Sequence, residues 1–545
     1  MDAGLLDPGD GRGAPVRPAG ARAAYAPSRQ LLLVLLCLLW FFPGVVGRGL
    51  WKPTETLMVP LAAESFAAGW NPVPALRGVP QLAEAPLYLY LAERGGAAFD
   101  FVLAPHEGMR LTNLLWLVLG LLLVGWHSGR DDGSRAGWRA VLLTLGSFSL
   151  LLSARSVNPD LALLPLGAAA LAGLRLTAEG QGRAGGLLLG AAGALGVWTV
   201  GAAALWYVAL LAALPLAAPR AFPGWRHAHV LPLALTLLAW SLWWAVLAGR
   251  GLAGAYQGQL LAALHPLALI AGLQDVLLAA LWAAWPALPF AVAAFLRWRH
   301  RGGSDPTLTL GLLGLAAGGG ALALAGHGRE TGVFLLLPAA ALMAAPYLRG
   351  QSRGMARMLD WFAILVIGGG MIGLFWLSWL AQRLDAPAGI VAWLAGLGLA
   401  DGDPSVPAVA LAAVASCAWF ALMLRIGRSS ERATLNWMAG LTMAWLVFGA
   451  LWMQPLDRAK SYETVAEQLR AAAGAEPGCL RAEGVGLENA ALLAHLTGLD
   501  VRPEAGASCP WLLASPAAAA GREAAWRGRR PGDGPAEGFV LLPAE

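Results

Sequence analysis

The feature that most constrains this chain is a series of long apolar runs separated by short polar segments. Runs of about 17–24 apolar residues are long enough to cross the hydrocarbon core of a bilayer as helices. We place thirteen of them, and they predict an α-helical polytopic membrane protein: 30–46, 111–127, 137–154, 160–177, 186–199, 202–217, 230–248, 277–297, 308–326, 332–348, 359–382, 406–426 and 434–453. Only 13% of the residues are charged, which excludes an ordinary soluble domain.

Two predicted spans have alternatives. The run at 30–46 could be a cleaved signal peptide, but the long preceding segment and the many later spans favour a retained helix. Gly201 marks either a break in one long helix or a turn between two. Residues 1–28 are rich in Pro, Gly, Ala and Arg without apolar periodicity, which predicts a disordered tail.

The arginines predict the orientation of the spans. Cytoplasmic loops carry an excess of Lys and Arg, and a cytoplasmic N-terminus places nearly every arginine cluster of the chain on that side. Arg250, Arg329 and Arg383 then stand nearly alone in the outer loops. This topology puts the first loop, 49–109, and the tail, 454–545, outside, with the membrane domain at 29–453. The net charge of +5 belongs to the loops and implies no nucleic-acid partner.

The tail predicts a small external α/β domain. Tyr462–Ala473 has the pattern of an amphipathic helix, and three strand-like pieces follow: CLRAEGVG, CPWLLAS and GFVLLPA. Two of the four cysteines, Cys479 and Cys509, lie here and would form a disulfide in an oxidising compartment. Cys37 and Cys417 lie in apolar runs, where cysteine is usually an inert small hydrophobe.

Polar residues on the predicted outer side carry the candidate chemistry. The stretch 51–90 is broken by prolines and cannot lie exposed in hydrocarbon, because its backbone groups would go unsatisfied. Glu55 in this stretch and Asp160 at the mouth of a span could serve as a general base and its orienting partner. The alternatives are a helix N-cap for Asp160 and a solvated loop carboxylate for Glu55. His106 and His327 are more often plain interface histidines, and no metal-ligand spacing occurs.

Several motifs resemble the protein O-mannosyltransferase and aminoarabinose-transferase superfamily of membrane glycosyltransferases, of GT-C type. The first external loop of that family is similar to TET at 54–56, GWN at 69–71, VPALRGVP at 73–80 and APLYLY at 85–90. Its second acidic motif is similar to SVNPD, ending at Asp160, and its LTKGP-containing segment aligns with GALGVWTVGA at 193–202. The resemblance covers nearly the whole chain, including the number of spans and the external domain.

This sequence departs from the family pattern at charged positions. The family's loop-one Asp falls on Thr54, its Glu-Lys pair on Ala83 and Glu84, and a second lysine on Val200. Both lysines would serve an anionic ligand, most simply a lipid phosphate. The remaining candidates for phosphate contact are Arg77, Arg110 and Arg329, with Glu84, His106 and Glu330 as supporting residues.

The resemblance implies a transferase that moves a sugar from a polyprenyl-phosphate carrier to a lipid, such as lipid A, or to another envelope acceptor. The reaction would occur at the outer face of a bacterial inner membrane, with Asp160 and Glu55 as the carboxylates. It implies no certain cofactor and leaves metal dependence open. A non-catalytic or regulatory member of the same fold is the second hypothesis. A transporter is the third, disfavoured because no internal repeat is visible and the polar groups gather at one face.

Overall fold

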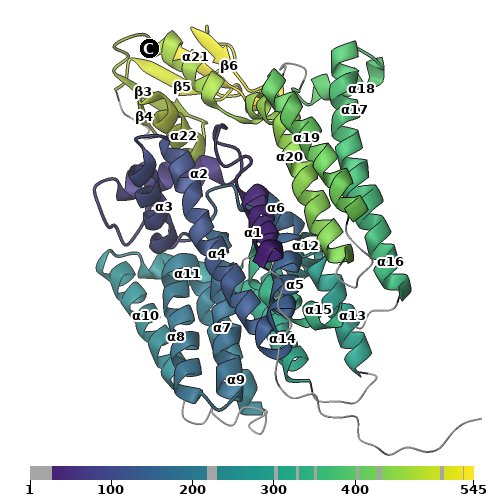
Figure 1. Ribbon diagram of the computed structural model, residues 1–545. Coiled ribbons are helices and arrows are strands. Elements are labelled where there is room, and N and C mark those ends of the chain that lie inside the picture. Colours follow the sequence, from purple (N-terminus) through teal and green to yellow (C-terminus); the bar gives the residue numbers. More distant parts are fainter. Residues whose placement is uncertain are drawn as a thin grey trace, which may run out of the picture.

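The computed structural model describes residues 27–217, 230–299, 305–326, 330–348, 353–399, 404–425, 432–503, 508–531 and 533–544. The predicted tail at 1–28 lies almost wholly outside this range. Figure 1 shows a bundle of long helices with a small mixed domain at one end. The first polar loop lies between the bundle and that domain.

Nine helices of the described residues are long and apolar enough to cross a membrane. Seven of them are single helices: α4 (Pro105–Asp132), α8 (Gly182–Val200), α10 (Val230–Gly249), α12 (Pro266–Ala283), α14 (Pro306–Leu324), α19 (Val406–Arg425) and α20 (Arg432–Lys460). The other two are composite. One joins η1 (Pro159–Ala162) to α7 (Leu163–Ala178), and one runs from α16 (Arg353–Phe362) through the π-helical η4 (Ala363–Gly370) to α17 (Met371–Leu384). Shorter apolar helices are α1 (Pro27–Phe41), α9 (Ala202–Ala217) and α15 (Leu337–Tyr347). The protein is therefore a multi-pass membrane protein by length and composition.

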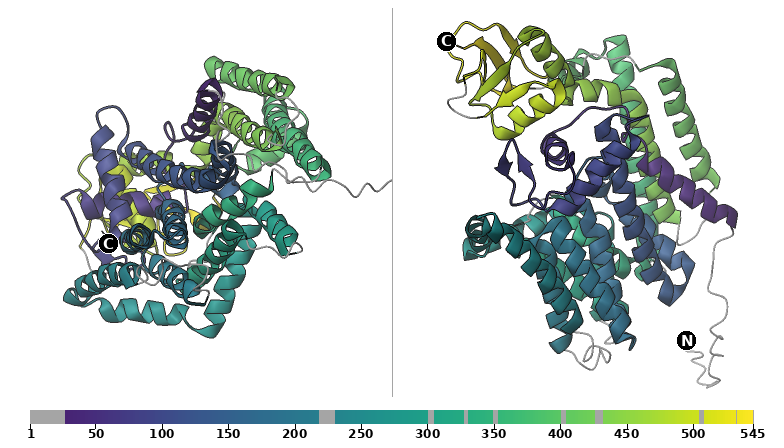
Figure 2. Two further views of the ribbon diagram at one scale, coloured as in Figure 1. Left: turned by 60° about the horizontal axis from the view of Figure 1, so that its bottom comes forward. Right: turned by 90° about the vertical axis from the view of Figure 1, so that its left-hand side faces the viewer.

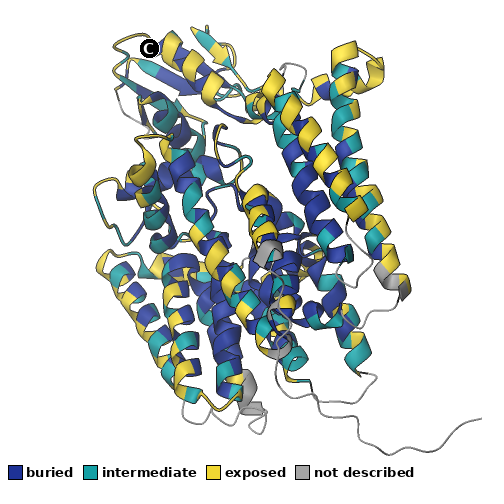
Figure 3. Cartoon of the chain, in the orientation of Figure 1, coloured by how far each residue is buried: buried dark blue, intermediate teal, exposed yellow. Residues whose placement is uncertain are grey.

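The helices divide into a central and a peripheral set. In α7, 89% of the most apolar window is buried inside the protein, whereas in α19 the share is 17%. The peripheral helices expose large apolar side chains to the surroundings, such as Leu267 on α12, Leu377 on α17 and Leu424 on α19. Figure 3 shows exposed positions along outer helices such as α10 and α19. A water-soluble surface rarely carries so large an apolar area, so this outer face fits a bilayer.

Three predicted spans are wrong as single helices. The run at 332–348 is divided between the 3-10 helix η3 (Glu330–Leu335) and α15. The run at 137–154 is divided into α5 (Ser134–Leu145) and α6 (Phe148–Ser153) by a turn at Gly146, against which the Trp437 ring packs. The run at 277–297 is divided between α12 and α13 (Ala287–Arg299), with Pro286 in the gap. Apolar composition continues through these breaks, so the sequence pattern did not reveal them.

Gly201 forms a turn between two helices. It has a φ of +66°, a conformation in which a residue with a Cβ is disfavoured. The helices on its two sides, α8 and α9, pack against each other instead of continuing in one line. Of the two alternatives for Gly201, the turn between two helices is therefore the correct one.

The first polar loop has its own secondary structure. It contains α2 (Glu55–Phe66), a two-stranded ribbon of β1 (Ala75–Leu76) and β2 (Val79–Pro80), and α3 (Pro86–Phe99). Pro86 begins α3, where its missing N–H costs nothing. Val73 and Leu82 of the loop pack with Trp243 of α10 and Tyr256 of α11 (Ala253–Ala263), so the loop rests on the ends of the bundle helices.

The C-terminal part is a five-stranded mixed sheet with two helices. Its strand order is β4-β3-β5-β7-β6, with β4, β3 and β5 parallel and β7 and β6 antiparallel to their neighbours. The elements are α21 (Glu463–Ala473), β3 (Cys479–Glu483), α22 (Leu487–Thr497), β4 (Asp500–Arg502), β5 (Trp511–Ala514), β6 (Trp526–Gly528), η5 (Pro535–Glu537) and β7 (Phe539–Pro543). The predicted helix and the three predicted strands are α21, β3, β5 and β7.

This sheet buries one face against the rest of the protein. Side chains alternate along a strand, so Leu541 of β7 joins the main core while Leu542 joins a small cluster on the far face. The helix α22 packs on α2 of the first loop. Figure 2 shows the sheet, α21 and α22 standing over α2 and α3 at one end of the bundle. A short helix, α18 (Ala388–Gly396), lies near the same end, after α17 (Figure 1).

Candidate functional site

Glu55 is the centre of a buried ionic cluster. Arg48 donates to its Oε2 at 2.6 Å, and Arg110 donates from Nε to its Oε1 at 2.7 Å. The backbone N–H of Trp51 and that of Val157 add bonds at 3.3 and 3.2 Å. Glu55 is 1% exposed. Its carboxylate therefore joins the first loop, α4 and the segment before η1, and no solvent or substrate reaches it in this conformation.

The two arginines use their donors within the cluster. Arg110 is completely buried and also donates to the carbonyl oxygens of Val45, Arg48 and Gly49. Burial alone would raise the pKa of Glu55, but the charges of Arg110 and Arg48 and their hydrogen bonds lower it to about 2. A carboxylate this acidic is a poor general base near neutral pH. The geometry argues against the predicted roles of Glu55 as a base and Arg110 as a phosphate ligand.

A second hydrogen-bond network holds the turn that carries Asp160. Tyr88 of α3 donates to Asn113 Oδ1 at 2.6 Å and accepts from the Asn158 N–H at 2.8 Å. The Asn113 amide donates to the carbonyl oxygens of Ala154 and Ser156. The 154–158 segment is thus fixed to α3 and α4.

Asp160 itself lies in the first turn of η1. Its N–H donates to Asn158 Oδ1 at 3.1 Å, so Asn158 is the capping residue. The side chain of Asp160 is partly exposed, in contrast to that of Glu55. Asn158 and not Asp160 is therefore the N-cap, and Asp160 is an acidic residue in the first turn.

A cavity of about 260 Å³ lies at the ends of α3, α8 and α14. Its walls come from the segment before α3, the α8–α9 turn, α11 and the end of α14, and include Ala83, Ala85, Val200 and Gln259. The turn η1 contacts both α3 and α8, whose ends border the cavity. The described lining contains no charged side chain, and it includes the aromatic rings of Trp243 and Tyr256. Two of the positions where the family has charged residues, Ala83 and Val200, thus lie in one apolar cavity.

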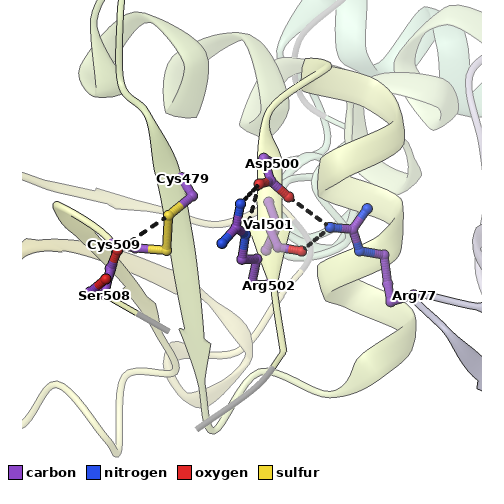
Figure 4. Close-up of a disulfide and its surroundings, with 7 residues drawn as sticks. All are labelled: Arg77, Cys479, Asp500, Val501, Arg502, Ser508 and Cys509. Atoms are coloured by element: carbon purple, nitrogen blue, oxygen red, sulfur yellow. Dashed lines mark hydrogen bonds and ion pairs between the residues drawn. A yellow bond between two sulfur atoms is a disulfide. The ribbon is translucent and has the colours of Figure 1, made fainter. Parts of the chain in front are cut away.

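Arg77 links the first loop to the C-terminal sheet instead of facing this cavity. Its Nη2 lies 3.1 Å from Asp500 Oδ1 and also donates to the Val501 carbonyl oxygen (Figure 4). Its backbone N–H donates to Glu64 Oε2 at 2.6 Å. The predicted phosphate role of Arg77 has no support in this geometry, because its guanidinium is already bound to the strand β4.

The remaining predicted residues are distributed around the loop. Glu84 is partly buried in the turn before α3, between two residues of the cavity wall. His106 Nε2 donates to the Arg48 carbonyl oxygen at 3.1 Å, so it supports the ionic cluster. Glu330 begins the turn η3 (Glu330–Leu335), which contacts η1. Arg329 and His327 lie outside the described residues.

The structure also brings in residues that sequence reasoning missed. Asp457, near the end of α20, accepts from the Gly49 N–H at 2.9 Å and from Trp51 Nε1 at 2.6 Å. The ionic cluster of Glu55 also contains Arg48, and the network at the turn of Asp160 contains Tyr88 and Asn113. The sequence offered one signal for them, since Arg48, Asn113 and Asp457 are polar residues at the ends of long apolar runs.

Cys479 and Cys509 form a disulfide that ties β3 to the segment two residues before β5 (Figure 4). Cys37 and Cys417 are free. Within the described ranges, no cluster of three His, Cys, Asp or Glu side chains is arranged to hold a metal ion.

The fold and this site define a class: multi-pass helical membrane proteins with a structured first loop and a small α/β domain at one end. Two solved structures share it. The crystal structure of ArnT from Cupriavidus metallidurans bound to undecaprenyl phosphate is similar to this chain with a TM-score of 0.65 and 15% identity, covering 95% of this chain and 98% of that one. The apo state of the same protein gives 0.64 and 15%, covering 94% and 98%.

The archaeal oligosaccharyltransferase AglB from Archaeoglobus fulgidus is a more distant structural match, with a TM-score of 0.45, 11% identity and coverage of 90% of this chain and 69% of that one. No protein-family model and no curated protein sequence matches this chain. The comparisons therefore show the GT-C type fold that the sequence motifs predicted.

Proposed function

We propose that this protein is a membrane glycosyltransferase that moves a sugar from a polyprenyl-phosphate carrier to a lipid, such as lipid A, or to another envelope acceptor. The single observation that carries the proposal is the likeness, over 95% of the chain, to a protein crystallised with undecaprenyl phosphate. The reaction takes place at the outer face of a bacterial inner membrane, with the C-terminal domain on that face.

Asp160 is the carboxylate that activates the acceptor. It accepts the proton of the acceptor hydroxyl while the acceptor oxygen bonds to the anomeric carbon of the sugar. The bond from that carbon to the carrier phosphate breaks, and the carrier leaves as a phosphate anion. Two features support this role: the turn of Asp160 is fixed by Tyr88 and Asn158, and its side chain is partly exposed.

The apolar cavity at the ends of α3, α8 and α14 holds the carrier. Its wall of aliphatic and aromatic residues suits a polyprenyl chain, and Gln259 can donate a hydrogen bond to the phosphate. Arg77 and Arg110 are bound elsewhere. Of the three predicted arginines, only Arg329 remains as the cation for the leaving phosphate.

One observation favours the second candidate, a non-catalytic or regulatory protein of the same fold. Val200 places an uncharged side chain in the cavity wall where the family has a lysine, and the family's other lysine falls on Glu84, between two residues of that wall. A departing phosphate without a nearby cation would be poorly stabilised. The activity experiment therefore has to distinguish a weak enzyme from an inactive one.

The test compares envelope lipids by mass spectrometry from cells that contain the wild type, Asp160→Asn or the matched control Asp100→Asn. Asp100 is an exposed carboxylate at the end of α3, so its change alters charge without touching the turn. We expect a sugar-sized mass increase with the wild type and the control and none with Asp160→Asn. An increase that persists in Asp160→Asn removes Asp160 from the mechanism. No increase with the wild type in any lipid, glycan or protein fraction favours the non-catalytic protein.

A further inference from the structure

A second cavity, of about 240 Å³, lies where the last membrane helix meets the C-terminal domain. Its walls come from the end of α20, the first turns of α21, the segment after β6 and Gly398 just beyond α18. The polar lining includes the hydroxyl groups of Ser461 and Thr464 and the amide of Gln468. The cavity belongs to neither Asp160 nor the ionic cluster of Glu55.

Three arginines line this second cavity, and two of them have no partner among the described residues. Arg530 is bound to Asp533 and donates to the Lys460 carbonyl oxygen at 2.8 Å. Arg458 and Arg529 are exposed and make no hydrogen bond or ion pair with any described residue. Their two guanidinium groups therefore supply uncompensated positive charge and free N–H donors.

The described part of the cavity wall contains no carboxylate to neutralise this charge. Among the acids close in sequence to the lining residues, Glu463 and Glu467 are exposed and outside the lining, whereas Asp457 and Asp533 have other partners. Asp457, next to Arg458, binds Gly49 and Trp51. Asp533 pairs with Arg530 and is 8% exposed. Guanidinium forks with neighbouring hydroxyl and amide donors form the typical recognition set for a phosphate group.

The surface next to the cavity carries several exposed apolar side chains beside the charged Arg383 and Asp385. Helix α18 ends at Gly396, two residues before the cavity wall. Trp393 on this helix is 63% exposed, and Leu397, just after it, is 45% exposed. At the end of α17, Leu384 is 66% exposed, and Gln382 donates to the Leu399 carbonyl oxygen at 2.9 Å, which joins α17 to the segment after α18. A free phosphate ion would gain nothing from these apolar side chains, whereas acyl chains would cover them.

We propose that the second cavity binds the phosphate headgroup of an anionic membrane lipid, with Arg458 and Arg529 as its ligands and the lipid chains lying along α17 and α18. The bound lipid fastens the C-terminal domain to the membrane helices, because its ligands come from α20 and from the segment after β6. This proposal does not depend on the transfer reaction.

The test measures lipid binding to the full-length protein in detergent by native mass spectrometry. The variant is Arg458→Gln/Arg529→Gln, and the matched control is Arg522→Gln/Arg527→Gln, which removes the same charge from two arginines of the same domain outside the cavity. The probes are phosphatidic acid, phosphatidylcholine and inorganic phosphate. Binding is titrated for each protein at equal detergent concentration.

We expect phosphatidic acid to bind the wild type and the control at least about tenfold more tightly than the variant, since hydrogen bonds to charged groups are lost. Phosphatidylcholine should not distinguish the three proteins. Equal affinity of the variant and the wild type for phosphatidic acid would overturn the proposal. Inorganic phosphate that binds as tightly as phosphatidic acid would also overturn it, because the cavity would then be a small-anion site.

Discussion

Arg110 and Glu55, separated by 55 positions in the chain, meet with a distance of 2.7 Å between Nε and Oε1 in a region from which solvent is excluded. Arg48 completes the cluster from the other side of the carboxylate. The interaction joins α4 to α2 and to the turn that follows α1. A buried charge is tolerated only when its partners are present, so the whole loop depends on these three side chains.

Glu55→Gln should strongly destabilise the protein. The amide leaves the charges of Arg48 and Arg110 buried without a counter-charge, and breaking such a pair typically costs about 3–5 kcal/mol. The measurement is thermal unfolding of the purified protein in detergent, followed by tryptophan fluorescence. Glu64→Gln, on the same helix but more exposed, serves as the control and should lower the melting temperature little. Similar melting temperatures for the two variants would show that the cluster adds no stability.

The same cluster predicts a pH dependence. The pKa of Glu55 is lowered to about 2, below its ordinary value of 4.5. Its ionised form therefore stabilises the folded state fully above about pH 4.5, and this contribution is lost as the pH falls towards 2. The difference in melting temperature between the wild type and Glu55→Gln should shrink over that range. A constant difference would mean that Glu55 does not titrate in this window.

The sequence predicted the class of fold but not the role of its central acid. Apolar runs are a strong signal, since each must satisfy its backbone hydrogen bonds within the membrane. The breaks at Gly146 and Pro286 were missed because composition stays apolar across them. Glu55 was predicted as a catalytic base because an acid in a polar loop is usually accessible. Only the fold shows that Arg48 and Arg110 enclose it.

Val200→Lys should increase affinity for undecaprenyl phosphate if the first cavity holds the carrier. Val200 lines that cavity at the end of α8, and a lysine there would add a charge-assisted hydrogen bond to the phosphate. The expected gain is about tenfold in binding, measured by native mass spectrometry. Leu264→Lys, outside the lining but next to Ala263 in the chain, controls for added charge. An equal gain in both variants would place the carrier elsewhere.

Cys479→Ser should destabilise the C-terminal domain. The disulfide closes a loop with a sequence separation of 30, and a cross-link of that size typically adds about 3 kcal/mol by restricting the unfolded chain. The variant should be cleaved faster by protease within residues 463–544, and its mobility on non-reducing electrophoresis should no longer change on reduction. Cys417→Ser removes a free cysteine and should do neither. Unchanged protease resistance of Cys479→Ser would contradict the stabilising role.

Arg77→Ala separates two roles for this arginine, the predicted phosphate ligand and the observed link to the C-terminal sheet. The link joins the β1–β2 turn to Asp500 and Val501 (Figure 4). Because it is partly exposed, its loss should cost no more than about 1 kcal/mol, while hydrogen exchange speeds up in both segments. Arg502→Ala removes the other arginine on Asp500 and should leave exchange in the β1–β2 turn unchanged. Affinity for undecaprenyl phosphate should stay at the wild-type level in both variants. If Arg77→Ala alone lowered the affinity for undecaprenyl phosphate, Arg77 would again be a candidate phosphate ligand. Its guanidinium would then have to leave Asp500 to reach the carrier.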